Sequence, residues 1–236
     1  MTRQEFYRCE YKRMNPGWED SVSIYRNYVD RNTHESTRIL DFGCGHVDLM
    51  RSVYSRTPYV YGIEPNNITL RRNITIQNKV VGFAEHIPFP GNFFDLAVSA
   101  WVIEHIDDTI GVFSDIHRVL KPGGKLIFLT PNSWNYITWI NRVIPNRMHD
   151  FLTRRLYARE EKDTYPVRYK MNSVAKIESV LSSLGFRRCQ VILNEDPSYI
   201  SFNQTLFMLS CFIEKILDFG RLEAAKVHII GIYQKI

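Results

Sequence analysis

Apolar and polar residues alternate along this chain in a pattern that predicts strands and helices in turn. Short apolar runs bounded by polar or glycine-containing segments predict buried strands near 38–42, 59–63, 79–82, 94–99 and 125–130. Between them, apolar residues at helical spacing predict helices near 47–55, 67–74 and 108–120. The alternation predicts an α/β fold with a doubly wound, mostly parallel sheet.

The regions on both sides of this alternating core follow their own patterns. Residues 21–31 have helical spacing and are expected to cover one face of the sheet, within an N-terminal helical cover at 1–37. A helix is predicted at 173–184, with Gly185 just past its end. The last two strands are predicted at Phe186–Leu193 and Lys226–Tyr233.

The segment 199–219 is apolar at helical spacing. Core packing or a dimer surface explains it most simply, and a membrane-surface helix is the alternative. We expect a single domain over 1–236, with a core at 38–132, an insertion at 133–172 and C-terminal helices and strands at 173–236. Because long insertions in compact domains are usually functional, the insertion is interpreted as an acceptor-binding lid.

Composition and charge indicate which partners, metal sites and cellular location to expect. The chain has 236 residues and a net charge of +5, and its surplus lies after residue 130, where 15 Lys and Arg face 10 Asp and Glu. The excess predicts either a solvated basic surface or an anionic acceptor or lipid surface. The four cysteines have no disulfide-like or zinc-like spacing, so no metal site is expected. The charged N-terminus is unlike a secretory signal, so we expect a cytoplasmic protein, with peripheral membrane contact left open.

The most informative turn runs from Asp41 to Asp48, at the end of the first predicted strand. A dinucleotide fingerprint anchored on Gly43 and Gly45 needs a third glycine where Asp48 stands, and its carboxylate would repel a pyrophosphate. No P-loop sequence occurs in the chain. The remaining common ligand carries an α-ammonium and a sulfonium, which a carboxylate at Asp41 attracts. The turn therefore predicts S-adenosylmethionine as cofactor.

Five segments in order resemble the class I S-adenosylmethionine-dependent methyltransferases, with the ubiquinone-biosynthesis O-methyltransferases among the similar groups. Glu64 also follows Gly43 by 21 residues, the interval at which a βαβ unit places an acid beside a ribose. The segments that carry the resemblance are Ile39–Gly45, Val60–Pro65, Ala84–Phe89 with Phe94–Ser99, Glu104–Ile106, and Arg118–Gly124. The resemblance implies a seven-stranded sheet with an antiparallel last strand, joined by a hairpin-like return.

The resemblance also implies which residues hold the cofactor. Asp41 and the turn at Gly43, Cys44 and Gly45 would hold its methionine end. The rest of the implied site consists of Glu64 and Pro65 at the ribose, Ala84 and Glu85 at the adenine, and Ser99, Ala100 and Trp101 at the methyl. Two residues depart from the family pattern: Val47 replaces a glycine, and Phe83 replaces an acid that commonly caps the adenine.

Residues that would act on the acceptor are harder to assign. His105 is the first candidate for a general base because imidazole titrates near neutrality, although in the family this histidine often has a structural role. His149 is the second candidate base. Candidate acceptor contacts in the insertion are Tyr136, Trp139, Arg154 and Arg155.

We therefore expect methyl transfer to a small molecule, a glycan or a lipid-linked acceptor, at oxygen, releasing S-adenosylhomocysteine. The alternatives are a nucleic-acid or protein methyltransferase, prompted by the basic insertion, and a cofactor-binding homologue without turnover. A nucleic-acid substrate is disfavoured because the chain lacks the Asn/Asp-Pro-Pro-aromatic tetrapeptide and a Pro-Cys nucleophile. The oligomeric state is left open.

Overall fold

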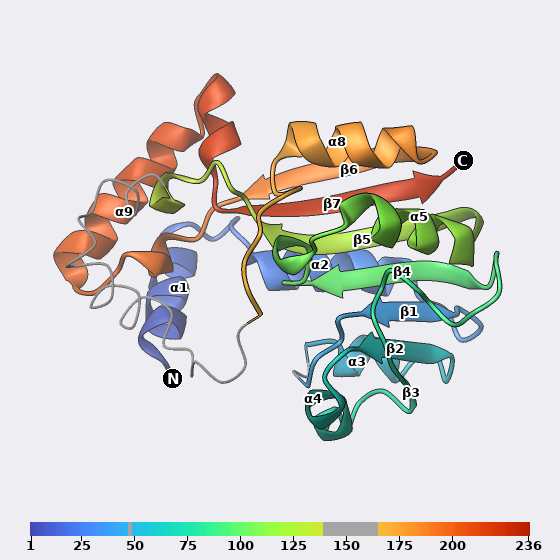
Figure 1. Ribbon diagram of the computed structural model, residues 1–236. Coiled ribbons are helices and arrows are strands. Elements are labelled where there is room, and N and C mark those ends of the chain that lie inside the picture. The colour runs from blue at the N-terminus through green and yellow to red at the C-terminus, as the bar shows by residue number, and fades with distance from the viewer. Residues whose placement is uncertain (47–48, 139–164) are drawn as a thin grey trace.

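A seven-stranded mixed sheet forms the centre of the protein (Figure 1). The computed structural model describes residues 1–46, 49–138 and 165–236. The strand order is β3-β2-β1-β4-β5-β7-β6. The strands are β1 (Ile39–Phe42), β2 (Val60–Glu64), β3 (Asn78–Val81), β4 (Phe94–Ala100), β5 (Leu120–Pro131), β6 (Phe186–Asn194) and β7 (His228–Lys235). The α/β prediction is confirmed, and all seven predicted strands exist.

The chain reverses direction only at one edge of the sheet. β1 pairs in parallel with β2 and β4, and β3 and β5 continue the parallel order. β7 runs antiparallel to both β5 and β6. The carboxyl ends of β1, β2 and β4 therefore meet at one edge of the sheet, which is where open α/β sheets bind their ligands.

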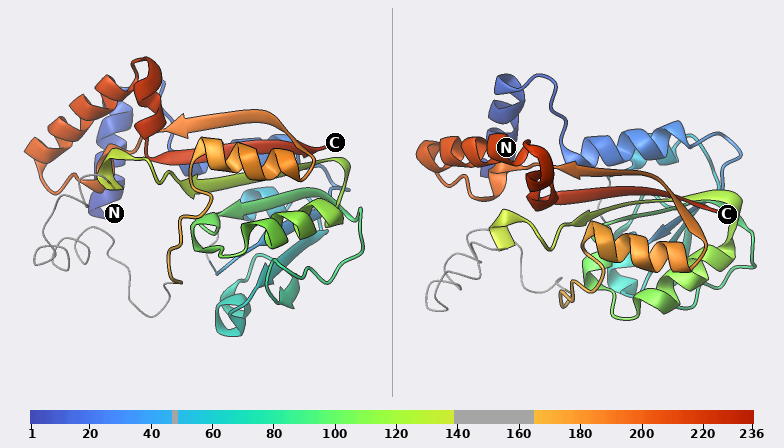
Figure 2. Two further views of the ribbon diagram at one scale, coloured as in Figure 1. Left: turned by 45° about the horizontal axis from the view of Figure 1, so that its top comes forward. Right: turned by 90° about the horizontal axis from the view of Figure 1, so that it is seen from above.

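Helices cover both faces of the sheet (Figure 2). One face carries α5 (Thr109–Val119) and α8 (Val174–Ser183), whose apolar residues pack with Leu40, Phe42 and Phe128. The other face carries α2 (Ser21–Arg31), α3 (Arg51–Tyr54) and α4 (Asn67–Arg72), which pack around Ile39, Val98 and Ile127 of the sheet. This two-sided burial explains why the central strands are continuous apolar runs.

A smaller unit lies beyond the carboxyl ends of the parallel strands (Figure 1). It contains α1 (Arg3–Met14) and α9 (Gln204–Leu217), joined by an apolar cluster in which Tyr7 stacks on Phe207 with ring centroids 4.8 Å apart. Tyr11 and Trp18 belong to the same cluster. The N-terminal cover is thus two helices, of which α2 packs on the sheet and α1 packs on α9.

Two expectations about local structure need correction. The last two strands pair as an antiparallel edge, but the expected hairpin-like return is wrong: η3 (Pro197–Tyr199), α9 and η4 (Gly220–Ala225) lie between them. The helix expected at 47–55 is described only as the single turn α3, since 47–48 lie outside the described residues. Both differences concern segments next to the carboxyl edge of the sheet.

Candidate functional site

A cavity of about 780 Å³ lies at the carboxyl edge of the parallel strands. Its walls come from the turn after β1, the end of β2, the segment 82–85 before β4, the exit of β4 and the segment 165–168. The volume is within the range of ordinary small-molecule sites. The sheet topology therefore brings residues from five separate segments to one site.

The turn after β1 forms the floor of this cavity. Gly43 has a φ of +68°, and a Cβ there would lie 2.4 Å from Cγ2 of Val102, so only glycine fits. Its N–H donates to the Ile63 carbonyl at 2.8 Å, and the Asn73 side chain donates to the Gly45 carbonyl at 3.0 Å. These bonds hold the turn against β2, and Cys44 lines the cavity beside the two glycines.

Asp41 is one of four acids that line the cavity, with Glu64, Glu85 and Asp107. It lies near the end of β1 and accepts a hydrogen bond from the Tyr54 hydroxyl at 2.6 Å. The pKa of Asp41 is raised to about 7, mainly by burial and to a smaller extent by the nearby charge of Glu64, whereas the hydrogen bond from Tyr54 opposes the rise. A carboxylate held in this state gains a large stabilisation when a cation such as an ammonium binds beside it.

Glu64 is the second of these acids, at the end of β2. It is 4% exposed. Its Oε2 accepts the Gly45 N–H at 3.2 Å, and its Oε1 accepts the Asn66 N–H at 3.1 Å. Oε1 also accepts the hydroxyl of Tyr165 at 3.0 Å. The carboxylate is thus fixed by backbone donors and already accepts a hydroxyl group.

The segment that carries Tyr165 crosses the cavity near the exit of β4. The backbone N–H groups of Arg168 and Tyr169 donate to the Glu104 carbonyl at 2.7 and 3.1 Å. The Pro166 carbonyl lies 3.2 Å from Nδ1 of His105. Sequence reasoning missed Tyr165 and Tyr54, because their contacts with the acids depend on the fold and no local pattern marks them.

Most of the predicted cofactor residues line this one cavity. They are Asp41, Gly43, Cys44, Gly45, Glu64, Pro65, Ala84, Glu85, Ala100 and Trp101. Ser99 does not line it: this serine is 1% exposed, because alternation along β4 turns its side chain into the sheet packing. Phe83, which stands where an acid was expected, lines the cavity and is exposed.

The candidate acceptor residues are less well placed. His105 lines the cavity, with Nε2 3.9 Å from Oε1 of Glu104. Tyr136 lies outside the cavity lining, because its hydroxyl donates to Oε1 of Glu214 in α9 at 3.0 Å. Val47, Trp139, His149, Arg154 and Arg155 lie outside the described residues.

The cavity fits S-adenosylmethionine in its chemistry. Asp41 supplies a negative charge for an ammonium. Glu64 accepts a hydrogen bond from the Tyr165 hydroxyl, so its carboxylate is placed to bind hydroxyl groups. Residues 40–128 match the family model described as a methyltransferase domain. The core of this chain is therefore similar to a methyltransferase domain. The matched range runs from β1 to β5 and includes both Asp41 and Glu64.

Two curated proteins resemble this chain over part of their length. The demethylmenaquinone methyltransferase of Geobacillus sp. (strain WCH70) is 28% identical over 138 residues, covering 50% of this chain and 57% of that protein. The sterol 24-C-methyltransferase of Pneumocystis carinii is 24% identical over 206 residues, covering 82% of this chain and 50% of that protein. The chain thus spans about half the length of these curated relatives.

A solved structure extends the likeness in fold to nearly the whole chain. The S-adenosylmethionine-dependent methyltransferase from Mesorhizobium loti has a TM-score of 0.59 at 18% identity, covering 89% of this chain and 96% of that one. At this identity the likeness concerns the fold. Among the described residues, no helix is long and apolar enough to cross a membrane.

Proposed function

We propose that this chain transfers the methyl group of S-adenosylmethionine to an apolar small molecule, with a lipid-linked compound as the preferred class and oxygen as the accepting atom. One observation carries the proposal: Asp41 and Glu64 reach one cavity from neighbouring strands, and that cavity continues to Trp101 and His105. Two acids on neighbouring strands suit a ligand that carries both an ammonium and ribose hydroxyls.

Different residues of the cavity would bind different parts of the cofactor. Asp41 would bind the ammonium, Glu64 would accept the ribose hydroxyls, and Pro65, Ala84 and Glu85 would border the adenine. The bound cofactor supplies an activated methyl group and its own leaving group. The protein has to align the acceptor, exclude water and remove a proton.

His105 is the proposed base. Nδ1 lies 3.2 Å from the Pro166 carbonyl, and in the tautomer that donates there, Nε2 carries the lone pair that a base needs. The relatives support an apolar acceptor, since those named above are called demethylmenaquinone and sterol methyltransferases. Transfer to oxygen is our expectation from the sequence resemblance, and the sterol relative is named as a C-methyltransferase.

We also propose that the protein contacts membranes at their surface. Four large apolar residues of α9, Met208, Leu209, Phe212 and Ile216, are exposed, as is Phe219 just beyond its end. The inward face of α9 holds the buried Phe207, Cys211 and Leu217 together with Ser210 and Glu214. A helix that exposes several large apolar side chains besides its buried face favours contact with an apolar partner, and a bilayer would also hold a lipid-linked acceptor.

The activity is tested with methyl-labelled cofactor and fractionated extract, followed by mass spectrometry of the compounds that gain the label. We expect the label in an apolar fraction, and His105→Gln should lose transfer while it keeps cofactor affinity. Label in RNA or protein instead would favour the alternative acceptors. Cofactor binding with no labelled product in any fraction would favour a homologue without turnover.

A further inference from the structure

Trp101 stands at the exit of β4 in an unusual backbone conformation. Its φ is +61°, a region that non-glycine residues rarely occupy, and its N–H donates to the Leu129 carbonyl at 2.9 Å. The residue lines the cavity beside Ala100. Backbone strain of this kind persists only where surrounding contacts enforce it, and it gathers at functional sites.

The ring contact that accompanies this conformation comes from β7, two strands away from β4 in the sheet. The indole of Trp101 meets the imidazole of His228, the first residue of β7, with ring centroids 4.9 Å apart and planes at 69°. This is the edge-to-face arrangement that aromatic rings prefer. His228 is 2% exposed, and burial lowers its pKa to about 4, so the ring is neutral at physiological pH.

Both ring nitrogens of His228 are held. Nδ1 lies 2.9 Å from Oγ of Ser21, and Nε2 lies 2.9 Å from the hydroxyl of Tyr199. Ser21 in turn accepts a hydrogen bond from the Asn194 amide at 2.9 Å. A rotation of the imidazole would break both contacts inside the protein, where unpaired polar groups are costly. The ring plane next to Trp101 is therefore fixed.

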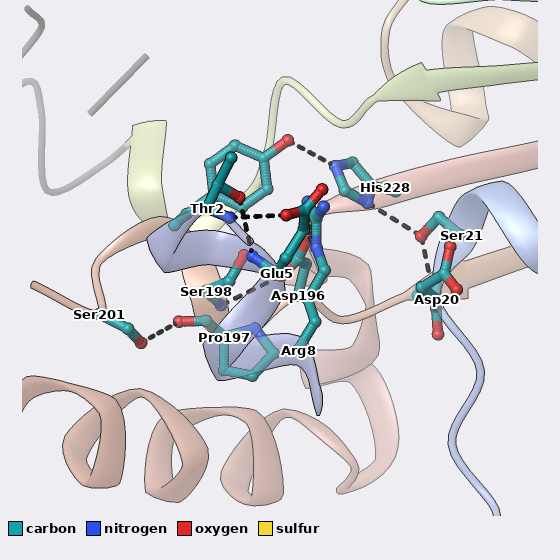
Figure 3. Close-up of polar contacts among 12 residues, drawn as sticks. Thr2, Glu5, Arg8, Asp20, Ser21, Asp196, Pro197, Ser198, Ser201 and His228 are labelled. Carbon is teal, nitrogen blue, oxygen red and sulfur yellow. Dashed lines mark hydrogen bonds and ion pairs between the residues drawn. The ribbon is translucent and has the colours of Figure 1, made fainter. Parts of the chain in front are cut away.

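The residues that hold His228 come from both ends of the chain (Figure 3). Ser21 begins α2, and Tyr199 belongs to η3. Asp196 caps η3 and accepts two hydrogen bonds from the Arg8 guanidinium of α1, at 2.9 and 2.6 Å. All these segments lie outside the matched range 40–128, and they converge on His228, which contacts the cavity residue Trp101.

We infer that His228 is a positioning residue that fixes the indole of Trp101 as the wall of the cavity at the end where the acceptor enters. Ser21, Tyr199 and His228 do not line the cavity, and they thereby set the shape of the site through Trp101. The inference rests on the proposed function for the role of this wall, whereas the fixing of Trp101 by His228 is measurable on its own.

The first measurement is the fluorescence of Trp101 alone, in a protein with Trp18, Trp134 and Trp139 changed to Phe. We expect His228→Ala to lower the anisotropy of Trp101 and shift its emission to longer wavelength. Tyr199→Phe keeps the imidazole of His228 and removes only the hydroxyl that contacts its Nε2, so it should have a smaller effect in the same direction. His117→Ala is the matched control, because this partly buried histidine has an edge contact with Phe186 instead.

The second measurement is a double-mutant cycle on the dissociation constant of S-adenosylhomocysteine. His228→Ala should weaken binding by about threefold to tenfold when Trp101 is present, and by less than about twofold when Trp101 is already Phe. If His228→Ala does not fold, Tyr199→Phe replaces it in both measurements.

Two results overturn the inference. One is an unchanged Trp101 signal in folded His228 and Tyr199 variants. The other is an equal loss of affinity with and without Trp101, which would indicate a general structural role. If the unsubstituted protein does not bind S-adenosylhomocysteine, the proposed function fails, and the fluorescence measurement still decides whether His228 positions Trp101.

Discussion

The hydroxyl of Tyr165 donates a hydrogen bond to Oε1 of Glu64 at 3.0 Å, although the two residues are 101 positions apart in the chain. Glu64 is the carboxylate that we assign to the ribose hydroxyls. In this structure, therefore, the tyrosine hydroxyl takes a position on the acid that a ribose hydroxyl would need.

Tyr165→Phe should raise the affinity for S-adenosylmethionine. The substitution removes a group that competes for Glu64, and loss of one such hydrogen bond predicts a gain of about twofold to tenfold. Titration calorimetry measures it. Tyr59→Phe is a matched control, since Tyr59 is 43% exposed against 44% for Tyr165 and does not line the cavity. Weaker binding in Tyr165→Phe would show that the hydroxyl helps to hold the cofactor.

Cofactor affinity should depend on the ionisation of Asp41. Burial raises its pKa to about 7 in the ligand-free protein, and an ammonium binds only the charged form. Below pH 7, affinity should fall by about tenfold per pH unit, and above pH 7 it should level off until the ammonium itself titrates near 8. Calorimetry from pH 5.5 to 8 tests this.

Two variants sharpen the pH test. Asp41→Asn should bind weakly with a flat profile below pH 7. Tyr54→Phe removes the hydrogen bond that lowers the pKa of Asp41, so the midpoint should move to higher pH. A midpoint that is the same in the unsubstituted protein and in Tyr54→Phe would contradict the assignment to Asp41.

The buried Glu214 of α9 should make stability depend on pH. Burial raises its pKa to about 8, so the folded state binds more protons than the unfolded state between about pH 4.5 and 8. The contribution of this group to stability therefore falls as pH rises through that window. Glu214→Gln mimics the protonated form. The difference in free energy of unfolding between this variant and the unsubstituted protein should therefore shift in favour of the variant by on the order of a few kcal/mol between pH 5 and pH 8.

Urea unfolding at pH 5 and pH 8 measures this shift. The exposed Glu223→Gln is the control and should differ little between the two pH values. An equal effect of Glu214→Gln at both pH values would mean that the carboxyl does not titrate in this range.

The exposed apolar side of α9 should support binding to vesicles. Phe212 is 61% exposed and Phe219 is 73% exposed, so Phe212→Ser with Phe219→Ser should reduce flotation with phosphatidylcholine and phosphatidylglycerol vesicles while folding is retained. Ile74→Ser, at a site 78% exposed elsewhere on the protein, should have no effect. Self-association that the double variant abolishes, without vesicle binding, would instead favour a second copy as the partner.

Local sequence patterns predicted the central strands well because β1, β2 and β4 are short runs of mostly buried residues with clear boundaries. They also indicated Asp41 and Glu64, which both line the cavity, since the turn after β1 and the interval to the end of β2 are local features. Ser99 was expected at the same site but does not line the cavity, because one step along β4 changes the side of the sheet that a residue faces. Tyr54, Tyr165 and His228 were missed because their roles come from contacts between distant segments.

The central claim is that Asp41 and Glu64 together hold S-adenosylmethionine, and calorimetry at pH 7.5 tests it most directly. The unsubstituted protein should bind the cofactor with a stoichiometry near one, and the exposed-site control Glu223→Gln should bind equally well. Asp41→Asn and Glu64→Gln should each weaken binding by about tenfold or more. Folded variants that bind as tightly as the unsubstituted protein, or no binding in any of the four proteins, would contradict the account.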